Sequence, residues 1–219
     1  MDENIIIILE KRGTVTATFR KLEPSKKQKI FETAREAFAF NTFENVSLDH
    51  VAAGASISKG SLIQYFAKKE NLLEFVSEIS IDNYRRSWEE YFAREFAVRA
   101  TDRIRRYFQT QLDTWENDKT GFRFYMKMHY ENDFNLTRSF TERILQLRRH
   151  YLSGMVTRGM ETGEIRRDLE PETIAFILLA AIRDLESAYL AGNLSPKEKL
   201  NLSDRAMKIS SMLFDGIGG

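Results

Sequence analysis

The hydrophobic positions from residue 47 to residue 66 are spaced as in two short helices with a tight turn between them. Ser47 and Ser58 each precede one helical pattern, where a serine hydroxyl can accept a hydrogen bond from a free N–H of the first turn. The apolar positions of the two helices are Leu48, Val51, Ala52, Leu62, Tyr65 and Phe66. The other side of the second helix is short, polar and nearly free of acidic residues, which favours contact with DNA.

The same periodicity predicts helices along most of the remaining chain. A first long helix begins at Ser25, and another extends from Lys69 to about Arg94. Further helices are expected near residues 101–115, 121–131, 137–162, 171–191 and 196–214. No segment of the C-terminal half alternates like a strand, so we predict an all-α fold of about nine helices.

The first 24 residues have a different pattern. The aliphatic run Ile5–Leu9, a turn signal at Gly13 and the alternation over residues 14–19 are typical of two strands. A hairpin or ordered arm is one interpretation, and an unstructured leader is the other. Because an isolated two-stranded hairpin is marginally stable in water, order without an outside partner is the less favoured of the two.

Composition narrows the possible functions. The 219 residues include no cysteine, which excludes disulfides and thiolate chemistry and is compatible with a reducing cytoplasm. The three histidines are scattered, and no nucleophile or glycine loop has the context of a catalytic motif, so we expect no enzyme, metal site or cofactor. The run Ile5–Leu9 is far shorter than the roughly 20 residues of a membrane helix, so we expect no membrane partner. The net charge of +1 gives no evidence for or against nucleic acid.

The segment Val51–Phe66, which reads VAAGASISKGSLIQYF, resembles the helix-turn-helix of the TetR family of bacterial transcriptional regulators. The usual pattern in that family is roughly I-A-x-x-A-G-V-S-x-G-x-L-Y-x-Y-F, and Lys69–Leu73 continues the match. The resemblance is strong over residues 25–73 and weaker, though consistent, to the C-terminus.

The sequence departs from the family pattern at three positions. Ser56 stands where a turn glycine is usual, Ile63 replaces a common tyrosine, and Thr42 occupies the place of a glycine that closes the first helix. We expect the neighbouring Asn41 to adopt the left-handed backbone conformation in place of that glycine.

The resemblance implies three regions: an arm of uncertain order (residues 1–24), a three-helix helix-turn-helix DNA-binding domain (residues 25–72), and a larger helical domain for effector binding and dimerisation (residues 73–219). It implies a homodimeric, cytoplasmic regulator, a repressor that a ligand releases from a pseudo-palindromic operator. The alternative is a helical ligand- or protein-binding module that has lost specific DNA binding, and the intact Ser58–Phe66 motif argues against it.

We predict two kinds of DNA contact in the helix-turn-helix. Hydroxyls and lysines at helix ends hold phosphates without reading sequence, and base edges are read from the exposed side of the second helix. The predicted phosphate contacts are Lys26, Lys27, Lys29, Ser47, Ser61, Tyr65 and Lys69. The predicted base-facing residues are Lys59, Gly60, Ile63 and Gln64, with Ser58 at the start of their helix.

Aromatic and methionine side chains are concentrated in the middle of the larger domain. On three predicted helices they recur at spacings of three, four or seven, and the resemblance favours a cavity for an apolar or aromatic-bearing effector over a solid core. The predicted lining is Phe108, Leu112, Trp115, Phe124, Met128, Phe140, Ile144, Leu147 and Tyr151. Six nearby polar side chains are each expected at the surface: Arg103, Arg106, His129, Arg148, Arg149 and His150.

The predicted helix over residues 171–191 is apolar on nearly every side, so it must be buried on both sides. The resemblance implies a homodimer formed by a four-helix bundle of the last two helices. The predicted interface residues are Ile174, Leu178, Ile182, Leu185, Tyr189, Ile209 and Met212.

Overall fold

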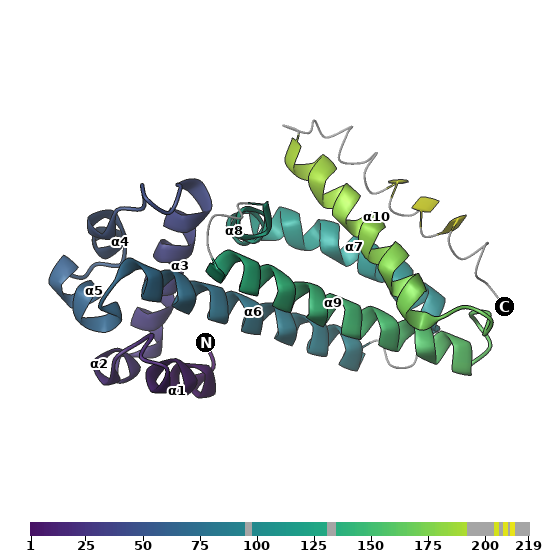
Figure 1. Ribbon diagram of the computed structural model, residues 1–219, viewed down its shortest axis with the longest axis horizontal. Coiled ribbons are helices and arrows are strands. Elements are labelled where there is room, and N and C mark those ends of the chain that lie inside the picture. The colour runs from purple at the N-terminus through teal and green to yellow at the C-terminus, as the bar shows by residue number, and fades with distance from the viewer. Residues whose placement is uncertain (95–97, 131–134, 192–203, 206–207, 210, 213–219) are drawn as a thin grey trace. The chain divides into compact units, whose positions relative to one another are not determined.

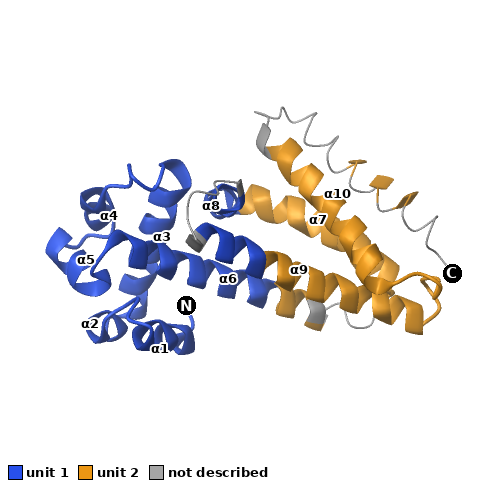
Figure 2. Ribbon diagram, viewed as in Figure 1, with its two compact units in different colours: residues 1–87, 118–143 blue, residues 88–117, 144–219 orange. Residues whose placement is uncertain are grey.

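A computed structural model of the protein describes residues 1–94, 98–130 and 135–191, with residues 204–205, 208–209 and 211–212. The described residues form ten helices and no strand, which confirms the all-α prediction (Figure 1). The chain divides into two compact units (Figure 2). Unit 1 comprises residues 1–87 and 118–143, and unit 2 comprises residues 88–117 and 144–219.

The helix boundaries follow the sequence pattern closely. Unit 1 contains α1 (Glu3–Lys11), α2 (Ala17–Arg20), α3 (Pro24–Phe40), α4 (Leu48–Gly54), α5 (Lys59–Phe66) and α8 (Lys119–Tyr130). Unit 2 contains α7 (Ala100–Asn117) and α10 (Pro171–Ala191), while α6 (Lys69–Arg94) and α9 (Asn135–Glu161) contribute residues to both units. The helix predicted over residues 196–214 lies mostly outside the described residues.

The N-terminal segment is ordered and helical, so the strand pattern was wrong, and so was the favoured interpretation of an unstructured leader. The Asp2 carboxylate accepts a hydrogen bond from the Asn4 N–H at 2.8 Å and begins α1. Ile6 and Leu9, three positions apart, are fully buried on one face of this helix. The isoleucine run therefore forms half-buried helix rather than strand, because tertiary packing outweighs the modest β preference of the residue.

Helix α8 packs against α3 within unit 1. The Arg35 guanidinium donates two hydrogen bonds to the Asp118 carboxylate, at 2.7 and 3.1 Å. The Arg123 side chain donates to the carbonyl of Ala39 at 3.2 Å. Asp118 also accepts from the Gly121 N–H, and a Cβ at position 121 would lie 2.2 Å from its Oδ2. The glycine therefore permits the close approach that ties α8 to α3.

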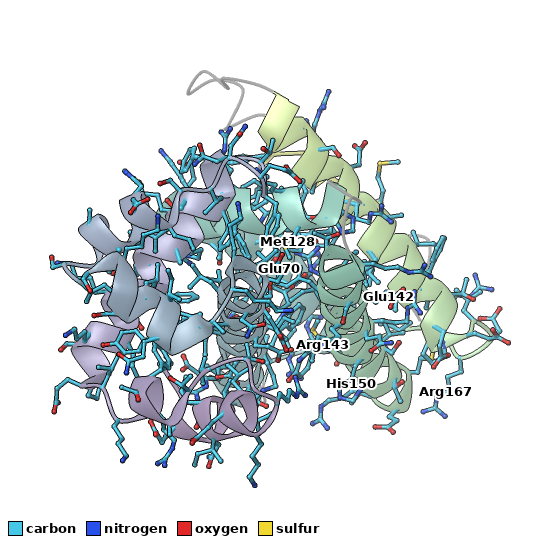
Figure 3. The ribbon with its side chains drawn as sticks, turned by 60° about the vertical axis from the view of Figure 1, so that its left-hand side comes forward. Glu70, Met128, Glu142, Arg143, His150 and Arg167 are labelled. Carbon is cyan, nitrogen blue, oxygen red and sulfur yellow. The ribbon has the colours of Figure 1, made fainter. Side chains whose placement is uncertain are left out.

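The part of α9 that belongs to unit 1 packs on α6 and α8. Arg143, labelled in Figure 3, forms a two-pronged ion pair with Glu78 of α6. The rings of Phe124 and Phe140 meet edge to face, with centroids 5.8 Å apart. Unit 1 is therefore one core that includes both the helix-turn-helix and residues 118–143.

Unit 2 has a core that combines stacked rings with a buried ion pair. The Trp88 ring lies 4.4 Å from that of Tyr107 and 5.1 Å from that of Tyr151. Arg148 of α9 and Glu186 of α10 are joined at 2.6 Å, and both side chains are almost completely buried. Such a pair is costly to break, because either charge left alone would be unsolvated.

Candidate nucleic-acid interface

Both helices of the helix-turn-helix begin at the predicted serines. The Ser47 hydroxyl accepts from the His50 N–H at 3.2 Å and caps α4. The Ser58 hydroxyl accepts from the Ser61 N–H at 3.0 Å and caps α5. The two side-chain oxygens of Ser58 and Ser61 lie 2.9 Å apart and share a further hydrogen bond.

Ser56 closes the turn between α4 and α5. Its φ of 57° lies in the left-handed region, which favours glycine. The Ser56 hydroxyl accepts a hydrogen bond from the Lys29 ammonium of α3 at 2.7 Å. The serine therefore adopts the conformation for which the family pattern uses glycine, and α3 holds its side chain.

The C-terminal cap of α3 differs from the one predicted from the sequence. Asn41 has extended backbone, with φ −130° and ψ 151°, so the prediction of a left-handed Asn41 was wrong. Its side-chain amide donates instead to the carbonyl of Ala37 at 2.9 Å. The Asn41 side chain thus bonds one of the last carbonyls of the helix, which in a glycine C-cap would be bonded by a backbone N–H.

Helix α5 has one buried side and one exposed side. Leu62, Tyr65 and Phe66 are 7% exposed or less and face the core of unit 1. The four residues predicted to face bases all lie on the exposed side: Lys59, Gly60, Ile63 and Gln64. Ile63 is a large apolar side chain that is nevertheless 45% exposed. A short helix with this face can enter a major groove.

Gly60 has no role in the packing of the protein itself. A Cβ built at this position would meet only the Ser58 hydroxyl, at an ordinary 3.8 Å. A glycine inside a helix costs about 0.5–1 kcal/mol relative to alanine. The missing side chain therefore lowers stability and leaves open space on the exposed face of α5.

Several predicted phosphate contacts have partners inside the protein. The Lys69 ammonium donates to the carbonyls of Glu44 and Val46, at 2.9 and 3.3 Å, and lies 4.8 Å from the Phe43 ring. Lys69 thus holds the loop that precedes α4. A phosphate contact by Lys69 would add to this structural role.

Lys26 and Lys27, at the start of α3, differ in exposure. Lys26 is exposed. Lys27 is 4% exposed, and its ammonium pairs with Glu3 of α1 at 3.0 Å. Because its charge is buried and neutralised, Lys27 is not part of the interface we propose. The pairing of Lys27 with Glu3 could not be predicted, because the N-terminal segment was not expected to form a helix.

The predicted effector residues divide between the two units. Phe124, Met128 and Phe140 belong to unit 1, where Phe124 and Phe140 contact each other. The other six belong to unit 2: Phe108, Leu112, Trp115, Ile144, Leu147 and Tyr151. Trp115 contacts the ring of Tyr189 at 5.5 Å. The effector pocket remains a prediction.

Three of the six polar side chains expected at the surface are buried. Arg103, His129 and Arg148 are 2%, 8% and 1% exposed, so the surface expectation was wrong for them. The remaining three, Arg106, Arg149 and His150, are exposed. Helical periodicity could have distinguished the buried from the exposed side chains. Arg148 lies four residues after the buried Ile144 and therefore on the same face of α9, whereas His150 lies on another face.

The residues predicted for the dimer interface lie mostly in the core of unit 2. Four of them are at most 3% exposed in the single chain, and we do not assign them to an intersubunit contact: Ile174, Leu178, Ile182 and Leu185. The Tyr189 hydroxyl donates to Glu116 at 2.7 Å. Met212 is 75% exposed, and Ile209 is half-buried. On α10 the exposed apolar side chains are Phe176 and Ile177, at 64% and 44%.

The described residues hold no group of three His, Asp or Glu side chains that could bind a metal ion. None of their helices combines the length and apolar character needed to cross a bilayer.

The described part of the chain is an all-α protein with an exposed helix-turn-helix in its N-terminal unit, the architecture of a DNA-binding regulator. Residues 30–76 match the model of the bacterial regulatory proteins of the tetR family. No curated protein matches the chain. The chain thus carries the DNA-binding domain of the tetR family and has the fold of TetR-family transcriptional regulators.

Three solved structures illustrate this fold. A TetR family transcriptional regulator from Chloroflexus aurantiacus has a TM-score of 0.67 and 20% identity, covering 94% of this chain and 99% of that one. The regulator FadR from Bacillus subtilis, in complex with stearoyl-CoA, has a TM-score of 0.70 and 18% identity, covering 87% and 99%. The fatty acid degradation regulator FadR from Bacillus halodurans has a TM-score of 0.70 and 13% identity, also covering 87% and 99%.

Proposed function

We propose that the protein is a homodimeric, non-enzymatic transcriptional repressor that leaves a pseudo-palindromic operator when it binds a small molecule. The observation that carries the DNA-binding proposal is the exposed face of α5, which presents Lys59, Gly60, Ile63 and Gln64 to solvent. Gln64 can pair with adenine and Lys59 with guanine in the major groove. Because it acts on DNA, we place it in the cytoplasm.

The outer face of α10 supports the dimer. Phe176 and Ile177 are exposed apolar side chains, and Ala180 continues the same face one turn later. Arg183 and Asp184 follow on the exposed side and carry opposite charges. In a two-fold dimer the same patch meets itself, so each arginine can approach the partner's aspartate. The second copy would cover the apolar face that a single chain leaves open.

An apolar effector is supported by the aromatic side chains within unit 2, Phe108 and Trp115 of α7 and Tyr151 of α9. The similar FadR from Bacillus subtilis was solved in complex with stearoyl-CoA, and this makes a long acyl chain a candidate effector here. A ligand that binds one conformation of the dimer better would favour it, and with it a separation of the two α5 helices that no longer fits the operator.

The DNA-binding proposal is tested by selection from a random-sequence duplex pool, followed by a mobility-shift assay on the recovered sequence. We expect a pseudo-palindrome whose half-sites lie one or more helical turns apart. Recovery of no preferred sequence would favour the alternative, a helical binding module without specific DNA recognition.

The effector proposal is tested by thermal unfolding with stearoyl-CoA, free stearate and aromatic acids as probes. A ligand at a hundredfold excess over its Kd should stabilise the protein by about 2.7 kcal/mol. The same compound should release the selected operator. Stabilisation only by hydrophilic metabolites or metal ions would contradict this part of the proposal.

A further inference from the structure

The N-terminal 22 residues precede the segment that matches the tetR family model, which begins at residue 30. They nevertheless contact the buried side and the end of α5 directly. Helix α5 ends at Phe66, and the carbonyls of its last turn have no partner inside the helix. Two of these carbonyls are bonded by Thr16. The Thr16 N–H donates to the carbonyl of Tyr65 at 3.0 Å, and the Thr16 hydroxyl donates to that of Gln64 at 3.1 Å.

Phe19 supports the same helix from its buried side. This ring is fully buried, with centroids 5.9 Å from Tyr65, 4.9 Å from Phe66 and 5.0 Å from Phe75 of α6. Tyr65 and Phe66 are two of the three buried side chains of α5. Phe19 therefore fills the space between α5 and α6.

The N-terminal segment is itself fixed to the rest of unit 1. The Asn71 side chain donates to the carbonyl of Gly13 at 3.1 Å, where a φ of 75° ends α1. Glu3 pairs with Lys27 at 3.0 Å, and Arg12 pairs with Glu78 at 3.3 Å. Thr16 and Phe19 are thus held by α3 and α6 on one side and contact α5 on the other.

The junction between α5 and α6 is strained. Ala67 has φ 59° and ψ −46°, and the Lys68 N–H donates to the carbonyl of Phe66 at 2.6 Å, as in a γ-turn. An alanine in this region costs on the order of 1–3 kcal/mol and persists only where the surroundings enforce it. The chain connection alone does not favour this orientation of α5, so packing has to supply it.

We propose that residues 2–22 form a brace that fixes α5 in its DNA-reading orientation before DNA arrives, with Thr16 and Phe19 as its positioning residues. The inference rests on the proposed function of α5. Without the brace, α5 would populate several orientations, and the affinity for operator would fall by the fraction of molecules in the competent one. The brace contacts α5 through its buried side and its last carbonyls, which leaves the exposed face to the DNA.

The test compares full-length wild type with Thr16→Val, Thr16→Ser and Phe19→Leu, using the duplex that wild type selects from a random pool. Valine removes the hydroxyl that donates to Gln64 and that also accepts from the Phe19 N–H at 3.4 Å, so both contacts of the brace weaken and we expect operator affinity to fall about five- to tenfold. Serine keeps the hydroxyl and should restore binding. Phe19→Leu leaves a gap beside Phe66 and should weaken binding on the order of tenfold. The matched control is Thr18→Val, the same change at an exposed threonine two residues away, which should bind as wild type.

Two further readouts separate a brace from other roles. Amide hydrogen exchange in the last turn of α5 should become several-fold faster in Thr16→Val while that of α4 stays unchanged. The dependence of affinity on salt should keep its slope, because Thr16 contacts no phosphate in this proposal. Wild-type binding and exchange in Thr16→Val would overturn the brace, and so would a reduced salt slope, which indicates direct DNA contact. If wild type selects no sequence, the DNA-binding proposal fails, and the exchange rates alone decide whether the segment holds α5.

Discussion

Gly60→Ala is expected to make the protein more stable and a weaker DNA binder. Gly60 lies inside α5, where the added Cβ would find only the Ser58 hydroxyl at 3.8 Å. No atom has to move, so the helix gains part of the advantage that alanine has over glycine in a helix interior, up to about 0.5–1 kcal/mol, because Gly60 is the second residue of α5. For a chain of this size that raises the Tm by up to about 4 °C.

The same methyl group points out from the proposed DNA-reading face. If the major groove approaches the α5 backbone at Gly60, an extra methyl in that contact costs about 1–3 kcal/mol, as overpacking does in a core. Operator affinity should therefore fall roughly 5- to 150-fold. Stability and binding are expected to change in opposite directions, an outcome that general damage to the fold cannot produce.

The assays are thermal unfolding and a mobility shift on the selected operator, with Gly154→Ala as the matched control. Gly154 is an exposed glycine inside α9 with no atom within 4 Å of the added Cβ, so it should gain similar stability and keep full DNA binding. A Gly60→Ala variant that binds operator as tightly as wild type would refute the assignment of Gly60 to the interface. A lower Tm would refute the packing argument.

Three more outcomes are expected. Gln64→Ala should cost about 1–3 kcal/mol at one base position and little on random DNA, as measured by mobility shift on single-base operator variants. Ile177→Glu should yield a monomer in sedimentation, because a carboxylate in the dimer contact would be unpaired, whereas Ile8→Glu, at an equally exposed isoleucine of α1, should leave the dimer intact. Burial and a hydrogen bond to Glu116 raise the pKa of Tyr189, so above about pH 10 the unfolded chain loses this proton first and stability falls as pH rises. Chemical denaturation of Tyr189→Phe should show a shallower loss of stability over that range.

Helical periodicity and capping residues were sufficient to predict most of the fold. The predicted helix over 171–191 has the same limits as α10, and Ser47 and Ser58 cap the helices that they were expected to cap. These signals are local, because a cap and an apolar stripe are properties of neighbouring residues. The exposed face of α5 was predicted for the same reason.

The errors arose where the outcome depends on distant parts of the chain. The run Ile5–Leu9 forms a helix whose Ile6 and Leu9 are buried by other parts of the chain, and nothing within the run itself encodes that burial. On α10 the sequence showed apolar residues on both faces, yet it could not indicate which face would meet the subunit's own core. The structure buries Ile182 and exposes Phe176. The division into domains at residues 24 and 72 stays a prediction about function, since compact unit 1 also takes in residues 118–143.

The lysines in and around the helix-turn-helix bear on how the protein would discriminate between DNA sequences. Lys59 pairs with Asp49 at 2.8 Å, and both side chains are more than half exposed, so the pair contributes little and Lys59 can leave it for a base at small cost. Lys27 is buried against Glu3, and Lys69 is held by the loop before α4. Because these two lysines are bonded within the protein, they contribute less to the attraction between the protein and DNA phosphates, and the net charge of +1 adds little to it. When the attraction to DNA of any sequence is weak, the base contacts of Gln64 and Ile63 make up a larger share of the binding free energy at the operator. A regulator with few phosphate contacts depends on the orientation of its recognition helix, because its affinity has no large nonspecific component to compensate for a misplaced α5.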